Sequence, residues 1–143
     1  MNVETPANCT CFDLRRAARA VTKIYDEALK PSGLRSTQFS LLSVVRNNGP
    51  IGITELAKML VMDRTTLTRN LKPLLDQELL LVVDGADRRQ RPIALTSRGR
   101  DRLAQARPLW LEVQARLANG LGEARWTGLI GGLDEVVHQA RRV

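Results

Sequence analysis

Histidine and cysteine are scarce in this chain of 143 residues, which contains one histidine and two cysteines. The histidine, His138, stands alone near the C-terminus. The sequence has no G-x-S-x-G motif, no cluster with metal-ligand spacing and no glycine-rich phosphate loop. Cys9 and Cys11 are too few to complete a tetrahedral zinc site. We therefore expect neither an enzyme nor a protein with a metal or another cofactor.

Long hydrophobic runs are also missing. No run approaches the roughly 20 apolar residues that span a bilayer. The first residues lack the charged start and apolar stretch of a secretion signal. These absences predict a cytoplasmic protein without a membrane partner. Hydrophobic residues still make up 43% of the chain, which is enough for one domain with a buried core.

Positive charge exceeds negative charge and is concentrated locally. Lysine and arginine number 22 against 15 acidic residues, a formal net charge of +7. Residues 88–107 hold seven arginines and one acid, Asp101. Such an excess attracts polyanions, which include nucleic acid, anionic membranes and acidic proteins. Because the excess lies in one stretch, it predicts a local cationic surface.

The spacing of apolar residues predicts a mainly helical chain with one β-hairpin. The expected elements are helices over 12–30, 37–47 and 55–60, a helix from about residue 64, strands over 79–83 and 92–95, a long helix after residue 96, and a last helix that includes 126–140. Ser36, Thr54 and Thr96 are the expected N-caps. A brief strand is expected at Ile53.

Proline and glycine mark the expected interruptions of these helices. Pro73 predicts a bend or slight break in the helix that begins near residue 64, because proline removes a backbone donor. Pro108 predicts a kink in the long helix, and residues 119–122 should end it. Gly131 and Gly132 weaken the last helix or allow another backbone to approach it closely.

The centre of the chain has the order of a winged helix-turn-helix. A short helix, a turn and a second helix are followed by a hairpin. In such units the second helix enters the major groove of double-stranded DNA. The candidate DNA contacts on these helices are Thr54, Arg64, Thr65, Thr66, Thr68 and Arg69. Arginine can bind guanine with two hydrogen bonds, and threonine can donate to phosphate. The alternative is an ordinary solvated helix start.

The hairpin carries further candidate DNA contacts in the stretch DGADRRQRPIALT. Arg88, Arg89 and Arg91 would lie in or beside the minor groove, where the negative potential is deep. Asp87 can hold one of these arginines through an ion pair. The alternative is a solvated run of charge on an exposed turn. The arginine run lies directly after the helix-turn-helix, and this position favours DNA binding.

The chain resembles the MarR family of transcriptional regulators. The resemblance rests on ITELAKML, RTTLTRNLKPLLDQELL and DGADRRQRPIALTSRGR, and on the helices at both ends. It implies a winged-helix homodimer, with Thr65, Thr66 and Arg69 in the major groove. It also implies Arg89 in the minor groove, steadied by Asp87. We expect a repressor; a winged-helix module that binds only proteins is the alternative from another class.

The end helices predict the domain organisation and the oligomeric state. We assign residues 1–33 and 98–143 to dimerisation helices and residues 34–97 to DNA binding. The apolar stripes of the end helices are larger than one small winged unit can cover. We therefore expect a two-fold homodimer that binds a palindromic operator. A monomer that folds its own ends together is the alternative. Trp110 and Trp126 are then core or interface residues.

Two kinds of signal are possible for such a regulator. MarR-like proteins usually release DNA when a small phenolic or carboxylate ligand binds between the dimer region and the winged unit, or when a cysteine is oxidised. Tyr25, Phe39 and Trp110 are candidate residues of an effector pocket, although each also fits an ordinary core position.

The first helix is similar to that of the organic-hydroperoxide branch of the family. The similar residues are Cys11-Phe12-x-Leu14, Ala18-Arg19 and Thr22-Lys23-x-Tyr25. In that branch a cysteine near the helix start is the sensor, and tyrosines bond to its thiolate. This implies Cys11 as a possible sensor, Tyr25 as its partner and Cys9 as a resolving thiol. Arg15 and Ser36 stand where two other tyrosines are expected.

Overall fold

A computed structural model describes residues 8–84 and 91–143, and within these ranges the chain is mainly helical with one small antiparallel sheet. The elements are α1 (Thr10–Leu29), the short 3-10 helix η2 (Lys30–Ser32), α2 (Ser36–Asn48), α3 (Ile53–Leu60), α4 (Arg64–Asp76), β1 (Leu80–Val82), β2 (Ile93–Leu95), α5 (Ser97–Leu121) and α6 (Glu123–Ala140). The expected fold class is therefore confirmed.

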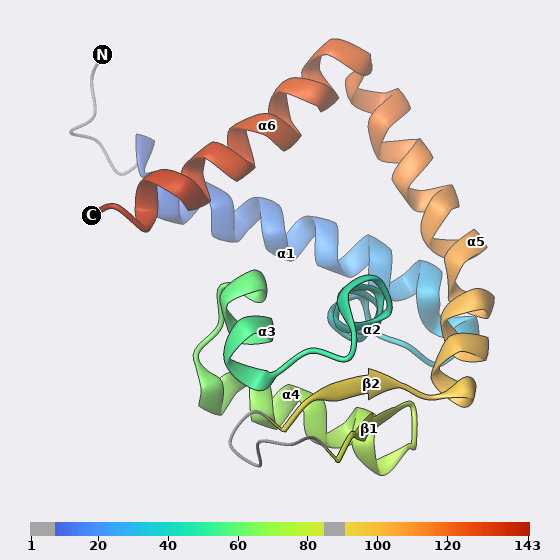
Figure 1. Cartoon of the computed structure of the whole chain (residues 1–143). Helices are drawn as coiled ribbons and strands as arrows, with labels where there is room; N and C mark the ends of the chain where they lie inside the picture. Colours follow the sequence, from blue (N-terminus) through green and yellow to red (C-terminus); the bar gives the residue numbers. More distant parts are fainter. Residues whose placement is uncertain (1–7, 85–90) are drawn as a thin grey trace.

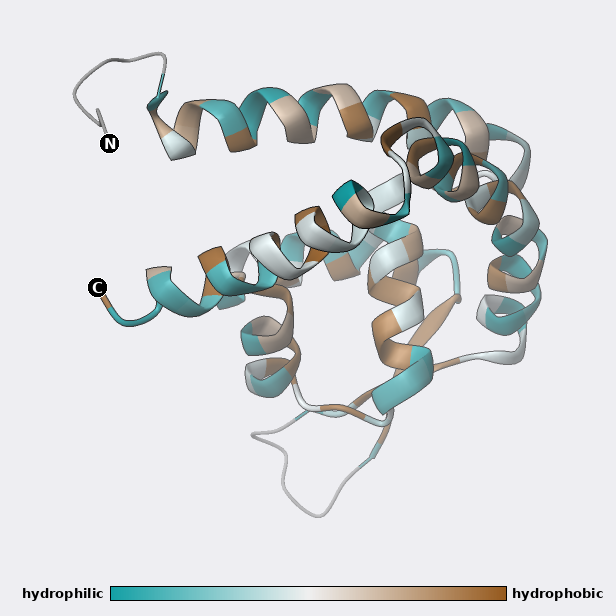
Figure 2. Ribbon diagram, turned by 90° about the horizontal axis from the view of Figure 1, so that it is seen from above, coloured by the Kyte–Doolittle hydropathy of each residue, from teal (hydrophilic) through white to brown (hydrophobic). Residues whose placement is uncertain are grey.

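The elements form two regions (Figure 1). Helices α2, α3 and α4 cluster with the β1–β2 hairpin into one unit, which we call the winged unit. Helix α1 lies along this unit, α5 leads away from it, and α6 turns back from the far end of α5. The chain ends of α1 and α6 lie on the same side of the molecule but are separated when seen from above (Figure 2).

The core of the winged unit follows from helical periodicity. Leu67, Leu71 and Leu74 of α4 are fully buried, and their spacing of four and three residues places them on one face. Strand β1 pairs antiparallel with β2. Ile51 extends this sheet, because its N–H donates to the Ile93 carbonyl at 3.0 Å and its carbonyl accepts the Ile93 N–H at 2.8 Å. The sheet residue before α3 is therefore Ile51 and not Ile53.

Two of the three expected caps are wrong. The residue before α2 is Arg35, and the backbone N–H of Ser36 donates to Asp26 Oδ1 at 2.7 Å. We expected the Ser36 side chain to cap α2. Instead, the Asp26 carboxylate of α1 accepts a backbone N–H at the start of this helix. Helix α3 begins at Ile53 after Gly52, so Thr54 lies inside its first turn.

The third cap is confirmed. Thr96 precedes α5, and its Oγ1 accepts a hydrogen bond from the Gly99 N–H at 2.9 Å. The same hydroxyl donates to the Glu78 carbonyl at 2.6 Å, which joins the start of α5 to the segment before β1.

Neither proline interrupts its helix. Helix α4 continues past Pro73 to Asp76, so no break occurs there. Pro73 lies in the last turns, where it removes a single donor, and the carbonyl of exposed Arg69 can turn to water. Helix α5 likewise runs through Pro108 to Leu121, and only Gly122, with a φ of 82°, separates it from α6.

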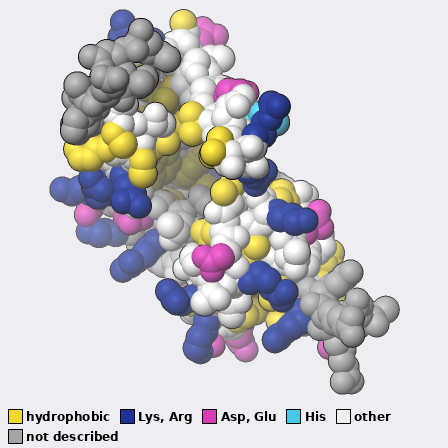
Figure 3. Space-filling model, turned by 90° about the vertical axis from the view of Figure 1, so that its left-hand side faces the viewer, with side chains coloured by type: hydrophobic (Ala, Val, Ile, Leu, Met, Phe, Trp, Pro, Cys, Tyr) yellow, Lys and Arg dark blue, Asp and Glu magenta, His cyan; other side chains and the backbone are white. Residues whose placement is uncertain are grey.

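Helix α6 buries no residue within the chain. Five of its apolar side chains are each more than a third exposed, namely Leu129, Ile130, Leu133, Val136 and Val137, whereas Trp126 is half-buried. In the view of Figure 3, hydrophobic side chains gather around a hollow in the upper half of the face shown. None of the helices in the described ranges is both long enough and apolar enough to cross a membrane.

Candidate nucleic-acid interface and aromatic cavity

The start of α4 is fixed by a carboxylate cap. Asp63 Oδ1 accepts the Thr66 backbone N–H at 2.8 Å, and Asp63 Oδ2 accepts the Thr66 hydroxyl at 2.8 Å. The backbone N–H of Thr66, followed by its hydroxyl, lowers the pKa of Asp63 below its ordinary value of 3.8. The cap is therefore ionised at neutral pH and orients the first turn of α4.

One face of α4 and the base of the hairpin enclose a groove of about 630 Å³, which we call the recognition groove. Arg64, Thr65, Thr68, Arg69 and Lys72 line it from the helix. Their spacing of about four residues places them on one side of α4. Arg91 and Val82 line it from the hairpin. The structure thus brings together four predicted residues of α4 and one predicted residue of the wing.

The recognition groove is cationic. Lys72 Nζ is paired with Asp76 Oδ2 at 2.8 Å, whereas Arg64, Arg69 and Arg91 form no ion pair within residues 8–84 and 91–143. All three arginines are exposed. Free guanidinium groups beside hydroxyl donors suit phosphate and base edges.

Other predicted residues lie outside the groove. Thr66 is half-buried and its hydroxyl is engaged with Asp63, so its side chain supports the cap. Thr54 is exposed on α3 and lines a separate depression with Lys58, Arg64 and Arg141. Three predicted wing residues fall outside the described ranges, namely Asp87, Arg88 and Arg89.

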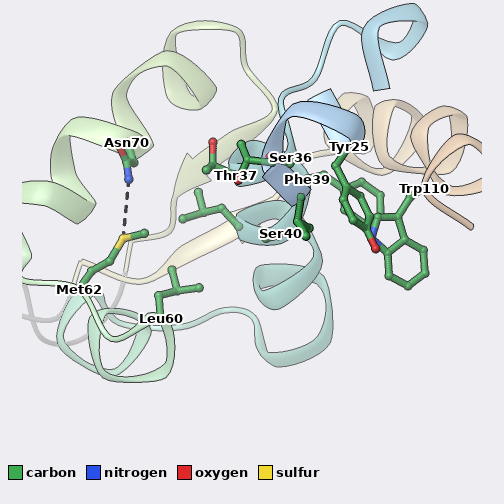
Figure 4. A pocket seen from close by; sticks show the side chains of 12 residues that line it. Tyr25, Ser36, Thr37, Phe39, Ser40, Leu60, Met62, Asn70 and Trp110 are labelled. Carbon is green, nitrogen blue, oxygen red and sulfur yellow. Dashed lines mark hydrogen bonds between the residues drawn. The ribbon is translucent and has the colours of Figure 1, made fainter. Parts of the chain in front are cut away.

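A second depression, the aromatic cavity, lies between the end helices and the winged unit and has a volume of about 420 Å³ (Figure 4). Tyr25 of α1, Phe39 of α2 and Trp110 of α5 all line it, as predicted. The rings of Phe39 and Trp110 are stacked, with centroids 5.5 Å apart.

One polar contact at the cavity joins α1 to α5, and another lies within the winged unit. The Tyr25 hydroxyl donates to Gln114 Oε1 of α5. Burial raises the pKa of Tyr25 above its ordinary value of 10.0, so this phenol stays neutral. On the opposite side, Asn70 Nδ2 of α4 donates to Met62 Sδ in the turn before α4 at 3.7 Å (Figure 4). A molecule in the cavity would touch both regions.

The two cysteines lie at the start of α1. Cys9 is the residue before the helix, Cys11 is in its first turn, and both thiols are free and exposed. Tyr25 lies 14 positions after Cys11 on the same helix, about 21 Å along its axis at about 1.5 Å per residue. With its hydroxyl bonded to Gln114, Tyr25 does not contact the thiol of its own chain.

Comparison with known proteins agrees with this architecture. The sequence pattern of the MarR family matches residues 34–90. The crystal structure of the transcriptional regulator MosR from M. tuberculosis is 35% identical, covers 99% of this chain and 100% of its own, and superposes with a TM-score of 0.83. The chain belongs to the MarR family.

Two further relatives extend the comparison. A crystal structure of MosR in complex with DNA is 42% identical over 93% of this chain and 98% of that chain, with a TM-score of 0.82. YwoH of Bacillus subtilis, an uncharacterised HTH-type transcriptional regulator, is 32% identical over 83 residues. That match spans 58% of this chain and 61% of YwoH, so the chain spans about three fifths of this curated relative.

The MarR-family segment contains α2, α3, α4 and β1, which carry most of both candidate sites. Sequence reasoning missed Lys72, although its spacing of four from Thr68 indicates the same helix face. It also missed Met62, Asn70 and Gln114 around the aromatic cavity. No sequence signal indicates these three. Gln114 meets Tyr25 through the packing of α5 against α1, and Asn70 meets Met62 through the packing of α4 against the turn before it.

Proposed function

We propose that this member of the MarR family is a DNA-binding repressor that binds a palindromic operator as a homodimer. The observation that carries the proposal is the recognition groove. There, Arg64 and Arg69 of α4 and Arg91 of the hairpin, which form no ion pair with another described residue, line the groove together with the exposed Thr65 and Thr68. This arrangement offers a helix to the major groove and cations to the flanking phosphates.

The relatives support DNA as the partner. MosR, which is 42% identical in its DNA complex, shares the fold over nearly the whole chain. A winged-helix module that binds only proteins would use such arginines only against an acidic partner. Arg88 and Arg89, which lie outside the described ranges, would extend the same cationic surface into the minor groove.

The exposed face of α6 supports the homodimer. No residue of α6 is fully buried within one chain, and the helix presents a row of exposed apolar side chains. A contiguous apolar face of this size usually marks an interface. Pairing with a second copy through a two-fold axis would cover it, and would place two copies of α4 about 34 Å apart, one turn of DNA.

The aromatic cavity supports release by a small effector. Its walls come from α1, α2 and α5 and from the turn and helix that carry Met62 and Asn70. A ligand that prefers one relative placement of these parts shifts the population toward it. We propose that an aromatic ligand in the cavity changes the spacing of the two α4 helices and lowers affinity for the operator.

Salt dependence of DNA binding tests the proposal. If a dimer neutralises roughly 6–10 phosphates, affinity should fall by about 10³–10⁵-fold between roughly 50 and 200 mM salt. Arg69→Ala should weaken operator binding by about 1–3 kcal/mol if it contacts a base, whereas a phosphate contact would reduce the salt slope by about one. Arg107→Ala, which removes the same charge from α5, is the matched control. Absent or salt-independent binding would favour the protein-interaction module.

A thiol switch is a second candidate, supported by the exposure of both thiols at the start of α1. A hydroperoxide would transfer one oxygen to the Cys11 thiolate and leave as the alcohol, giving a sulfenate. Cys9 of the same or a partner chain could then condense with it, forming a disulfide and releasing water. Cys11→Ser should abolish any release of DNA by peroxide. Release that persists in this variant would exclude the thiol as the switch.

A further inference from the structure

The aromatic cavity is lined by neutral side chains. Its described lining consists of aliphatic, aromatic, hydroxyl and amide groups, namely Val21, Thr22, Tyr25, Ser36, Thr37, Phe39, Ser40, Leu41, Leu60, Met62, Asn70 and Trp110. Within this part of the chain, no lysine, arginine, histidine or acid contributes to the wall. The cavity therefore provides hydrogen-bond partners and stacking surfaces but no counter-ion.

Charged groups lie beside the cavity but do not line it. The Asp26 carboxylate lies against the rim, where it accepts the Ser36 N–H at 2.7 Å. Arg35 and Arg69 line an adjoining depression of about 270 Å³, which shares Thr37, Leu41 and Asn70 with the cavity. Arg19 and Lys23, together with Asp26 and Glu27, line another depression, which shares Thr22 with the cavity. The charged groups beside the cavity thus line other depressions, and those of α1 include both signs.

The start of α2, which could otherwise attract an anion, is also engaged. The Arg35 N–H donates to Gln38 Oε1 at 3.0 Å, and the Ser36 N–H is held by Asp26. Side chains therefore already occupy two of the backbone donors that a helix start offers to an anion. A carboxylate that entered the cavity would lose its hydration without gaining a cation or these donors.

We propose that the aromatic cavity selects uncharged aromatic molecules, such as phenols, quinones or aromatic amides, and discriminates against aromatic carboxylates. This inference rests on the proposed effector role of the cavity, and it narrows the ligand class that the sequence left open. The stacked Phe39 and Trp110 rings supply a flat apolar surface. Among the described residues, the Asn70 amide forms one hydrogen bond, a weak one to the Met62 sulfur, so it can turn to a ligand oxygen or nitrogen.

A pair of ligands with the same shape and different charge tests the proposal. Binding of 2-naphthamide and 2-naphthoate to the full chain is measured by titration calorimetry at neutral pH, without DNA. The amide should bind with a dissociation constant at least about tenfold lower, because only the carboxylate leaves a charge buried without a partner. Equal or tighter binding of the naphthoate overturns the proposal, as does failure of both compounds to bind at millimolar concentration.

A variant with a cation added at the cavity provides a second test of the proposal. Ser40 is exposed at the edge of the cavity, so Ser40→Lys adds an ammonium group there without filling the core. It should raise naphthoate affinity at least about tenfold and leave naphthamide affinity nearly unchanged. Gln105→Lys, at an exposed site on α5 away from the cavity, should leave both affinities unchanged. If Ser40→Lys does not change the ratio, the absence of a counter-ion is not what selects the ligand.

Failure of this inference can be distinguished from failure of the proposed function. Ligand binding is measured in the absence of DNA, and salt-dependent operator binding is measured in the absence of ligand. A protein that binds DNA but prefers the naphthoate retains its proposed function and loses only the proposed selectivity.

Discussion

At the scale of single residues, Asp63 connects the chemistry of one carboxylate to the placement of α4. Its ionised oxygens accept both the N–H and the hydroxyl of Thr66, which lowers its pKa. A group whose folded pKa is depressed adds stability above its unfolded pKa, and this contribution is lost as pH falls through the lower folded value. The cap therefore stabilises the fold at neutral pH and weakens in acid below 3.8.

Asp63→Ala should lower the free energy of unfolding at neutral pH, because it removes both acceptors from the first turn of α4. The difference from the unchanged protein should shrink as pH falls below 3.8. Urea denaturation at several pH values measures it. Asp63→Asn keeps an oxygen acceptor and should lose less stability, with a weaker dependence on pH. A difference that grows in acid would contradict the assignment of the lowered pKa.

Val61 holds an uncommon backbone conformation in the turn before α4. Its φ of 54° lies in the left-handed region, which β-branched residues rarely adopt. Because its side chain is 58% exposed, little packing is lost on replacement. Val61→Asn should therefore raise the unfolding free energy by about 1 kcal/mol. Met59→Asn, at an exposed site within α3, should lower it instead, and thermal denaturation of both variants compares the two signs.

At the scale of elements, Gly99 sets how closely α5 approaches the hairpin. A Cβ atom at Gly99 would lie 2.1 Å from the Leu79 carbonyl oxygen and 2.8 Å from Leu95 Cδ1. That carbonyl cannot easily move, since it accepts the Thr96 N–H at 3.1 Å. Glycine is therefore required here by contact with backbone atoms.

Gly99→Ala should destabilise the protein by about 1–3 kcal/mol, because the added methyl group forces α5 away from β1. Gly120→Ala is a matched control in the same helix. Apart from its neighbours and the backbone of its own helix, no described atom lies within 4 Å of its added Cβ, and alanine suits a helix better, so this change should be neutral or stabilising. Equal melting temperatures for the two variants would show that the close approach at Gly99 is not maintained.

Features that depend on neighbouring residues could be predicted from the sequence, whereas features that depend on distant segments could not. The Thr96 cap was predicted because one side chain and its own helix determine it. The start of α2 was not, because the acceptor for Ser36 comes from Asp26, ten positions earlier in another helix. The periodicity of α4 placed its buried leucines and its exposed face. The role of Gly99 and the lining of the aromatic cavity depend on packing between distant segments, which local patterns do not contain.

At the scale of the whole molecule, the apolar side chains of α6 are not fully buried by the described residues of one chain. Helix α6 turns back from the far end of α5 (Figure 1). Directly after its C-terminal end, Arg141 Nη2 donates to the Lys58 carbonyl of α3 at 2.6 Å. A partner subunit packed on α6 would therefore contact a helix that is joined to α3. In the proposed dimer, the interface and the DNA-binding helices would then be mechanically connected through this helix.

Leu133→Glu tests this view, because it places a charge on the apolar face of α6 and, in a two-fold dimer, two like charges near each other. We expect the variant to sediment as a monomer, to keep its helical circular dichroism, and to bind a palindromic operator far more weakly than the unchanged dimer. Gln105→Glu adds the same charge to α5 outside this face and should remain dimeric. A Leu133→Glu protein that stays dimeric would place the interface elsewhere. Loss of helical structure would instead show that α6 is needed for the fold of one chain.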